Sequence, residues 1–235
     1  MKYPIVEGSF RSPHGVPMRM AYRENTNDWN TLTATLTQDE YALPAGLSGV
    51  AVDIGAYLGS VAIALALDNP SLDVVAIEPV WANADLIERN VAANMVWHRV
   101  KVVRGAVGAG DAVTVAYGFK GTEASEHHAF VGNSTLGYGL THESRVYKPI
   151  TLQALVDRYG DIEFMKIDCE GGEWPFLTGP LERVGPIVGE AHAIGGHRGG
   201  DIAKVLKRTH VVETFGDLDG TVEFTAIPPG WAIAS

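Results

Sequence analysis

A short apolar run that ends in an acid and leads into a glycine turn constrains the fold most. Residues 50–53 (Val-Ala-Val-Asp) predict a buried strand, Gly55 and Gly59 a tight turn, and residues 60–68, rich in Ala and Leu, a helix. Residues 50–67 approach the ~20 apolar residues that span a membrane. Asp53 and the two glycines favour strand, turn and helix instead, a unit typical of α/β folds.

The alternation of strand and helix continues along the chain. Further strands are predicted at 73–78, 100–103, 112–117, 162–168 and 186–192, and helices at 84–95, 152–159, 174–183 and 201–207. Segments 210–215 and 221–227 flank Asp217-Leu-Asp-Gly220, a turn composition that predicts an antiparallel hairpin. The sequence therefore predicts an α/β doubly wound sheet, mostly parallel, with an antiparallel C-terminal hairpin strand.

The chain is expected to form one compact domain, because its 235 residues contain no linker. Residues 1–49 predict irregular structure followed by a helix near 29–40, and we interpret them as an N-terminal lid or substrate segment. Residues 50–235 form the main domain. A polar insertion at 118–145 interrupts it, and loops of that length are often functional.

Composition excludes several classes of protein. Hydrophobic residues at 46% and charged residues at 20% are globular values, which argue against a disordered chain, a collagen or a coiled coil. A net charge of −10 gives no electrostatic reason to bind nucleic acid. The single cysteine, Cys169, forms no intrachain disulfide, and the first residues lack the apolar core of a signal peptide. We expect a cytoplasmic protein with no membrane partner.

Acids follow the predicted strands at the edge where α/β sheets bind ligands. They are Asp53, Glu78, Asp168 and Glu190. Gly55 would let a ligand approach the backbone, and the helix after it favours negative charge. Glu78 can accept both hydroxyls of a ribose, although a carboxylate at a helix start is also simply favoured by the dipole. The spacing G-x-x-x-G disfavours a dehydrogenase, but NAD and S-adenosylmethionine both fit this pair of motifs.

A second acid group lies after the strand at 162–168. Asp168, Glu170 and Glu173 would repel one another unless cations, hydrogen bonds or a substrate faced them, so this clustering indicates a site. Asp168 should point into the crevice, whereas Glu173 could cap the next helix.

Four motifs in order and spacing resemble the FkbM-type S-adenosylmethionine-dependent methyltransferases. They are Val52-Asp-Ile-Gly-Ala-Tyr-Leu-Gly59, Ala76-Ile-Glu-Pro79, Glu88-Arg-Asn-Val-Ala-Ala-Asn94 and Lys166-Ile-Asp-Cys-Glu-Gly-Gly-Glu173. Upstream, Arg23-Glu-Asn-Thr-Asn-Asp28 and Glu40-Tyr41 are similar to the segment that precedes the glycine motif in that family. The resemblance covers residues 23–192 and implies a class I methyltransferase (Rossmann-like) fold, whose seven-stranded sheet has an antiparallel last strand.

The resemblance also implies a cofactor site. Asp53, Gly55, Ala56 and Gly59 would surround the methionine half of S-adenosylmethionine, Glu78 beside Pro79 would bind its ribose, Ala106 and Val107 would lie near adenine, and Asp168 would lie beneath the sulfonium. Tyr57 departs from the family pattern, in which a small polar residue, often Asn, is common. The backbone turn at Tyr57 is expected to persist.

The implied activity is O-methylation of a small-molecule or sugar-like natural-product hydroxyl. Such a transfer needs an aligned acceptor and a base within about 3 Å of its oxygen. Asp168, Glu170, Glu190 and His192 are the catalytic candidates, with His192 the first choice because an ordinary imidazole titrates near neutrality. A structural role for His192 is an equally open interpretation.

A divalent metal could also acidify a hydroxyl. Asp168, Glu190, His192 and His197 offer ligands, and His127, His128 and His142 of the insertion offer more, but no spacing is that of a metal motif. We expect no metal.

Two other functions are open. Arg99, Lys101 and Arg104 with Lys204, Lys207 and Arg208 could form the basic face of an RNA methyltransferase. The Asn-Pro-Pro-Tyr-like run of adenine methylation is replaced by Asp168-Cys-Glu-Gly, and Cys169 is poorly placed for cytosine chemistry. A nonenzymatic adenosyl-nucleotide-binding module is the third hypothesis, which the acid cluster disfavours.

Overall fold

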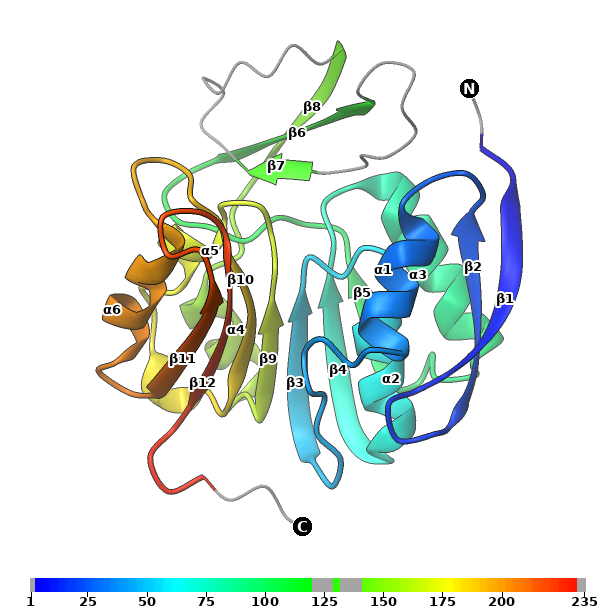
Figure 1. The fold of residues 1–235 in the computed structure, drawn as a ribbon, viewed down its shortest axis with the longest axis horizontal. Helices are drawn as coiled ribbons and strands as arrows, with labels where there is room; N and C mark the ends of the chain where they lie inside the picture. Colours follow the sequence, from blue (N-terminus) through cyan, green and yellow to red (C-terminus); the bar gives the residue numbers. More distant parts are fainter. Residues whose placement is uncertain (1–2, 120–128, 132–140, 232–235) are drawn as a thin grey trace.

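The computed structural model describes residues 3–119, 129–131 and 141–231. Its centre is a seven-stranded sheet in the order β11-β12-β10-β9-β3-β4-β5 (Figure 1). The parallel strands are β3 (Ser48–Ile54), β4 (Ser71–Ile77), β5 (Val100–Val103), β9 (Phe164–Ile167) and β10 (Ile187–Ala191). β12 (Val222–Ile227) runs antiparallel to both β10 and β11 (Val211–Gly216), which confirms the predicted C-terminal hairpin.

Helices cover both faces of this sheet. α1 (Asp28–Leu36), α2 (Ser60–Asp68) and α3 (Trp81–Ala93) share one core cluster with Val74 and Ala76 of β4. α4 (Leu152–Tyr159), α5 (Glu173–Phe176) and α6 (Ile202–Leu206) share the other with Val75 and Ile77. Because successive residues of β4 face opposite layers, its carboxyl half is apolar without interruption, as expected of a doubly covered parallel strand.

Short 3-10 helices complete the second face. They are η1 (Leu181–Arg183), which follows Pro180, so that the helix expected at 174–183 consists of α5 and η1, and η2 (Gly199–Asp201), which precedes α6. None of the helices in the described ranges is long and apolar enough to cross a bilayer.

The N-terminal segment differs from the expected irregular structure. β1 (Ile5–Arg11) and β2 (Pro17–Arg23) form an antiparallel hairpin that packs on α3. In β2, Met18 and Met20 are buried while Arg19 between them is exposed, the period of two that marks a half-buried strand. α1 ends at Leu36 rather than near residue 40, because Asp39 already has a left-handed backbone (φ +50°).

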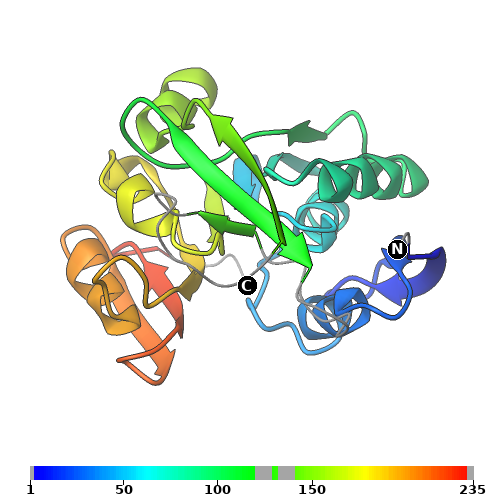
Figure 2. The same cartoon turned by 90° about the horizontal axis from the view of Figure 1, so that it is seen from above.

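The strand expected at 112–117 does not join the main sheet. β6 (Val113–Phe119) pairs with β7 (Ala129–Val131) and β8 (Thr141–Tyr147) in a separate three-stranded sheet. Figure 2 shows β6 and β8 crossing the carboxyl ends of the parallel strands. The Tyr147 hydroxyl donates to the Pro79 carbonyl at 2.5 Å and so ties this sheet to the loop after β4. Residues 120–128 and 132–140 of the predicted insertion lie outside the described residues.

Candidate functional site

A cavity of about 360 Å³ opens where the parallel strands end. Its walls come from the loops after β3, β4, β5 and β9, from the end of β10, from the start of α2 and from one face of α1. Most of the sequence-predicted site residues line it, namely Gly55, Ala56, Tyr57, Glu78, Pro79, Ala106, Val107, Asp168, Glu170 and Glu190. Strand ends as distant in the sequence as those at Gly55 and Glu190 therefore converge on one region, as a parallel sheet requires.

Asp53, Gly59 and His192 are not among the residues that line the cavity in the described part of the chain. Asp53 is fully buried beneath it, where its carboxylate accepts a hydrogen bond from the Ala62 amide at 3.1 Å. Burial raises the pKa of Asp53. Asp53 therefore fixes the start of α2 rather than facing the cavity.

Gly55 is required by a close approach within the protein itself. Its φ is +73°, and a Cβ there would lie 1.8 Å from the Asp168 carbonyl oxygen. The sequence indicates a glycine that admits a ligand, but the backbone that approaches this glycine is that of β9. The turn at Gly55 thus locks the ends of β3 and β9 together.

Tyr57 has a left-handed backbone, with φ +51°. Asn tolerates this conformation better than most residues, which gives a physical reason for the small polar residue expected here from the resemblance and makes Tyr57 the departure. The turn persists with Tyr57, as expected. The phenol hydroxyl donates to Asp28 Oδ1 at 2.5 Å, so this side chain points to α1.

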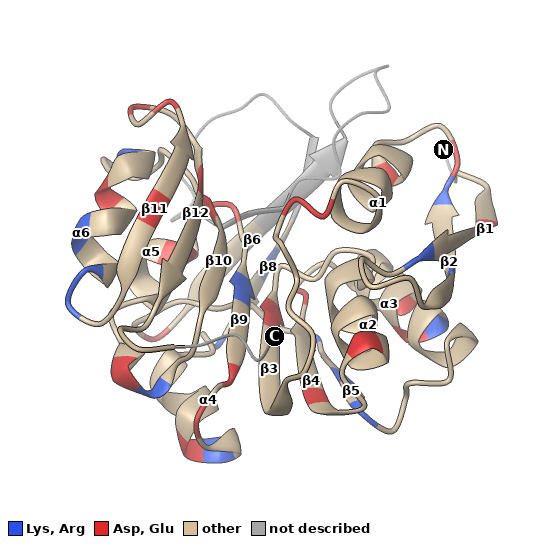
Figure 3. Ribbon diagram, turned by 60° about the horizontal axis from the view of Figure 1, so that its bottom comes forward, with Lys and Arg blue, Asp and Glu red and all other residues tan. Residues whose placement is uncertain are grey.

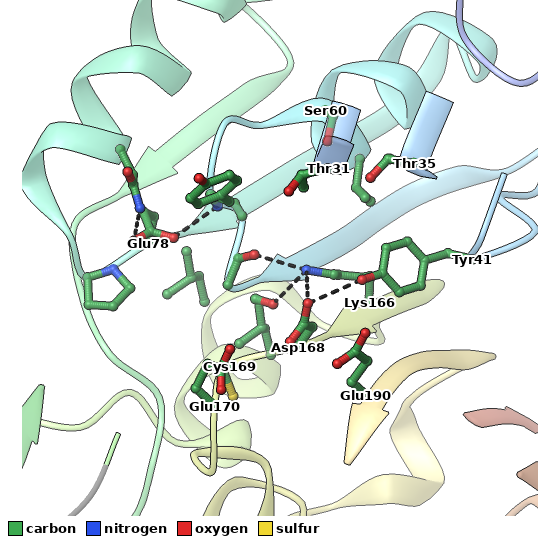
Figure 4. Close-up of a pocket in the computed structure, with 18 of the residues that line it drawn as sticks. Thr31, Thr35, Tyr41, Ser60, Glu78, Lys166, Asp168, Cys169, Glu170 and Glu190 are labelled. Carbon is green, nitrogen blue, oxygen red and sulfur yellow. Dashed lines mark hydrogen bonds and ion pairs between the residues drawn. The ribbon is translucent and has the colours of Figure 1, made fainter. Parts of the chain in front are cut away.

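Glu78 forms one end of the cavity (Figure 4). It is buried and accepts hydrogen bonds from the Val80 amide at 2.8 Å and the Tyr57 amide at 2.9 Å. Burial raises the pKa of Glu78 to about 7, although these hydrogen bonds act in the opposite direction. A carboxylate fixed by backbone donors, with lone pairs left to accept further hydrogen bonds, suits recognition of hydroxyl groups.

Lys166 is a site residue that the sequence reasoning assigns no role. It is buried in β9, and its Nζ donates to the Gly55 carbonyl at 2.9 Å and lies 3.6 Å from Asp53 Oδ1 and 3.8 Å from Asp168 Oδ2. Burial opposes its charge, but Asp168 and Asp53 outweigh burial and raise the pKa of Lys166. The sequence feature that points to Lys166 as a site residue is its position as a lone cation within the apolar strand Phe164-Met-Lys-Ile.

Tyr41 and two threonines of α1 form the wall opposite Glu78. The Tyr41 hydroxyl donates to Asp168 Oδ2 at 3.2 Å, and Thr31 and Thr35 face the same space (Figure 4). This end of the cavity is therefore rich in hydroxyl groups.

His192 lies behind the cavity within a group of carboxylates. Its Nε2 is 3.3 Å from Glu170, 3.5 Å from Glu190 and 3.9 Å from Asp168. Its Nδ1 lies 3.1 Å from Oε1 of Glu173, which also accepts from the His192 amide at 2.8 Å. Burial opposes protonation, but the hydrogen bond to Glu173 and the nearby Glu170 raise the pKa of His192 to about 9. His192 is therefore an imidazolium at neutral pH.

Glu173 and Glu190 have different roles in this group. Glu173 is fully buried and begins α5, and its Oε2 accepts from the Gly171 amide at 2.8 Å, so it anchors the loop after β9. Glu190 faces the cavity, and burial together with the charge of Asp168 raises its pKa to about 7.

One group in the described ranges has the proximity of metal ligands. Ligand atoms of Asp168, Glu170 and His192 lie within 4.8 Å of one another, and oxygen and imidazole donors suit a divalent cation. His197 stacks on Trp174 at 4.4 Å and is not in this group. His127 and His128 lie outside the described residues, as does the side chain of His142.

Cys169 is not activated as a nucleophile. Burial and the neighbouring Glu173, 3.5 Å from its sulfur, raise the pKa of the thiol well above its ordinary value. A thiol in such surroundings stays protonated and inert.

Two of the solved structures that this chain resembles are methyltransferases of low sequence identity. Precorrin-6y C5,15-methyltransferase from Geobacter metallireducens GS-15 has a TM-score of 0.51 at 14% identity and covers 88% of this chain and 92% of its own. M. capricolum TrmK in complex with S-adenosyl-homocysteine has a TM-score of 0.48 at 8% identity and covers 86% and 67%. At these identities the likeness concerns the fold alone.

Family membership rests on the sequence. No curated protein sequence matches the chain significantly. The profile of the methyltransferase FkbM domain matches residues 53–220, well over half of the chain, and this range includes the glycine turn, Glu78 and the carboxylates after β9 and β10. The protein therefore belongs to the FkbM methyltransferase family and is a methyltransferase.

Proposed function

We propose that the protein transfers the methyl group of S-adenosylmethionine to a hydroxyl group of an uncharged small molecule, such as a sugar-like natural product. The observation that carries this proposal is a single cavity with Glu78 at one end and Asp168 and Glu190 at the other (Figure 4). The cofactor supplies a methyl group already activated by its sulfonium. The protein must then bind the two reactants in line and remove one proton.

The residues at the Glu78 end fit an adenosyl group. Glu78 can accept hydrogen bonds from ribose hydroxyls, and Pro79, Ala106 and Val107 add small apolar surfaces on which a flat base can lie. Asp168 at the other end brings negative charge that favours a sulfonium.

Glu190 is the best placed proton acceptor. A general base needs a free lone pair, which the imidazolium of His192 lacks at neutral pH, whereas Glu190 faces the cavity and titrates near pH 7. We assign the proton transfer to Glu190, with His192 and Glu170 as its positioning partners. In this proposal Glu190 acts as the base, in place of His192, which is the first choice from the sequence.

The α1 end suits a hydroxyl-rich, uncharged acceptor. Asn27, Asn30, Thr31 and Thr35 present amides and hydroxyls on the helix face that lines the cavity. Lys166 is the single cation among the described lining residues, and it already contacts two carboxylates. A phosphate or carboxylate acceptor would meet Glu40, Asp168 and Glu190 with no free cation to offset them.

The surface does not favour the RNA methyltransferase alternative. Arg99, Lys101 and Arg104 lie at β5, and Lys204 lies in α6 beside β11, so the two basic groups occupy opposite edges of the sheet. Arg104 pairs with Asp85 at 2.7 Å, and Figure 3 shows Lys and Arg dispersed among Asp and Glu. Nucleic-acid binding needs clustered basic residues.

A metal requirement is not part of the proposal. The His192 imidazolium already places one positive charge among Asp168, Glu170 and Glu190. We expect turnover to survive treatment with a chelator, measured as S-adenosylhomocysteine release with and without EDTA. Loss of turnover that added magnesium or manganese restores would instead assign a cation to Asp168, Glu170 and His192.

We also infer a cytoplasmic location, since the single cysteine needs no oxidising compartment.

Calorimetric titration with S-adenosylmethionine, S-adenosylhomocysteine and NAD tests the cofactor. We expect micromolar binding of the two adenosyl compounds and none of NAD. Glu78→Ala should weaken binding about tenfold or more, the size of a lost hydrogen bond to a charged group. Asp73→Ala, an exposed acid at the other end of β4, is the matched control and should change nothing. Preference for NAD, or equal affinities in wild type and Glu78→Ala, contradicts the assignment.

A further inference from the structure

Five buried or cavity-lining residues form a closed circuit of hydrogen bonds beside Glu78. Arg23 donates from Nε to Asp28 at 2.8 Å and from Nη1 to Asn83 Oδ1 at 2.8 Å. The Tyr57 hydroxyl donates to Asp28 at 2.5 Å. Glu78 closes the circuit, because it accepts from Asn83 Nδ2 at 3.3 Å and from the Tyr57 amide at 2.9 Å. We refer to these residues as the polar ring.

The polar ring joins parts of the chain that are distant in sequence. Arg23 ends β2, Asp28 begins α1, Tyr57 lies in the glycine turn and Asn83 lies in α3. The first two belong to the segment Arg23-Glu-Asn-Thr-Asn-Asp28, in which the proposed reaction gives a task only to Asn27. The ring therefore attaches the N-terminal hairpin to the cofactor end of the cavity.

The ring is buried, so each of its hydrogen bonds matters. Asp28 and Asn83 are at most 1% exposed and Arg23 is 8% exposed. Burial opposes the charge of Asp28, yet its hydrogen bond and ion pair with Arg23 lower its pKa. A buried polar group that loses its partner keeps its desolvation cost, so the ring resists partial opening.

We propose that Arg23, Asp28, Tyr57 and Asn83 are positioning residues that couple the β1–β2 hairpin to the binding of the cofactor ribose by Glu78. This inference rests on the proposed function, since it takes S-adenosylmethionine as the ligand of Glu78. Coupling is reciprocal, so the cofactor must stabilise the hairpin as much as the hairpin stabilises the binding of the cofactor. Neither β1 nor β2 contributes a described lining residue to the cavity. Any effect of the cofactor on these two strands must therefore pass through other residues, which we propose are those of the polar ring.

Hydrogen exchange of the full chain measures that transmission. With S-adenosylmethionine bound, amides of residues 5–23 should exchange more slowly in the wild type, and Tyr57→Phe should remove most of this protection. In calorimetry, Tyr57→Phe should weaken S-adenosylmethionine binding at least about fivefold, the lower end of coupling between sites. Tyr22→Phe is the matched control, because it removes a phenol hydroxyl next to Arg23 but outside the ring. It should preserve both the protection and the affinity.

A double-mutant cycle separates coupling from a merely structural role. Among the hydrogen bonds of the ring, Tyr57 and Asn83 are linked only through Glu78 or through Asp28 and Arg23. Once either Tyr57→Phe or Asn83→Ala has opened the ring, the second change should cost less affinity than it does alone. Thermal unfolding of each variant checks that it is folded.

The outcomes for the ring and for the cofactor are distinguishable. Wild-type protein that binds S-adenosylmethionine without protecting residues 5–23 overturns the coupling and leaves the proposed function intact. Affinity losses of Tyr57→Phe and Asn83→Ala that simply multiply also overturn it. A folded wild type that does not bind S-adenosylmethionine overturns the proposed function, and this inference with it.

Discussion

At the scale of single residues, the position of a side chain relative to its neighbours decides its chemistry. His192 and Glu190 are two positions apart at the end of β10, yet one is surrounded by carboxylates and the other faces the cavity. The pKa of His192 is raised to about 9, so it keeps a proton that an ordinary histidine loses near neutrality, and the pKa of Glu190 is raised to about 7, so it titrates near neutrality instead of in the acid range. In the proposed function Glu190 therefore takes the role of base, for which His192 is the first choice from the sequence.

The charge of His192 makes stability depend on pH. Its pKa is about 9 in the folded protein against 6.5 in the unfolded chain, so the folded state binds the extra proton between these values. The resulting stabilisation, up to about 3 kcal/mol, is complete below pH 6.5 and lost as pH rises to 9. Urea unfolding should show that the stability difference between wild type and His192→Gln shrinks over this range. A constant difference would contradict it, and exposed His98→Gln is the control.

Glu190→Gln should separate catalysis from cofactor binding. The amide cannot take a proton, so turnover should fall about 100-fold or more, the usual contribution of a general base. Affinity for S-adenosylmethionine, measured by calorimetry, should change less than about threefold. Glu213→Gln on the exposed edge strand β11 is the matched control. Equal losses of turnover and affinity would assign Glu190 to binding instead.

At the scale of elements, the site depends on how closely β3 and β9 approach each other. Gly55 has the Asp168 carbonyl where a Cβ would stand, and both partners are backbone that cannot rotate away. Because Gly55 has no Cβ, the ends of the two strands, and the acids they carry, can approach each other this closely.

Gly55→Ala should destabilise the protein by roughly 3 kcal/mol or more, because a strained φ and a backbone clash combine. Gly110→Ala isolates the strain, since Gly110 has a similar φ of +79° but nothing within 4 Å of an added Cβ. That control should cost only about 1 kcal/mol. Chemical denaturation of both variants measures the difference, and equal losses would show that the approach of β9 is not the constraint.

At the scale of the whole molecule, the distribution of charge bears on the nucleic-acid alternative. The chain carries a net charge of −10, and its basic groups at β5 and α6 lie at opposite edges of the sheet. We expect fluorescence anisotropy with labelled tRNA to show no binding at micromolar protein, even at 50 mM salt where nonspecific contacts are strongest. Micromolar binding that weakens steeply with salt would revive the nucleic-acid alternative.

Local patterns in the sequence are enough to predict the order of the main elements and the acids at the strand ends. The strand, glycine turn and helix at 50–68, the helix at 152–159 and the C-terminal hairpin all follow from local periodicity and turn residues. The β1–β2 hairpin was missed because Pro and Gly obscured its alternation, and β6 was assigned to the wrong sheet because strand pairing is not a local property.

The surroundings of those acids, in contrast, depend on the three-dimensional fold. Lys166 beneath Asp168, the imidazolium of His192 and the polar ring around Glu78 all depend on partners that are distant in sequence. Charge states and hydrogen-bond partners follow from burial and from separations of 3–4 Å, and the folded chain alone sets both.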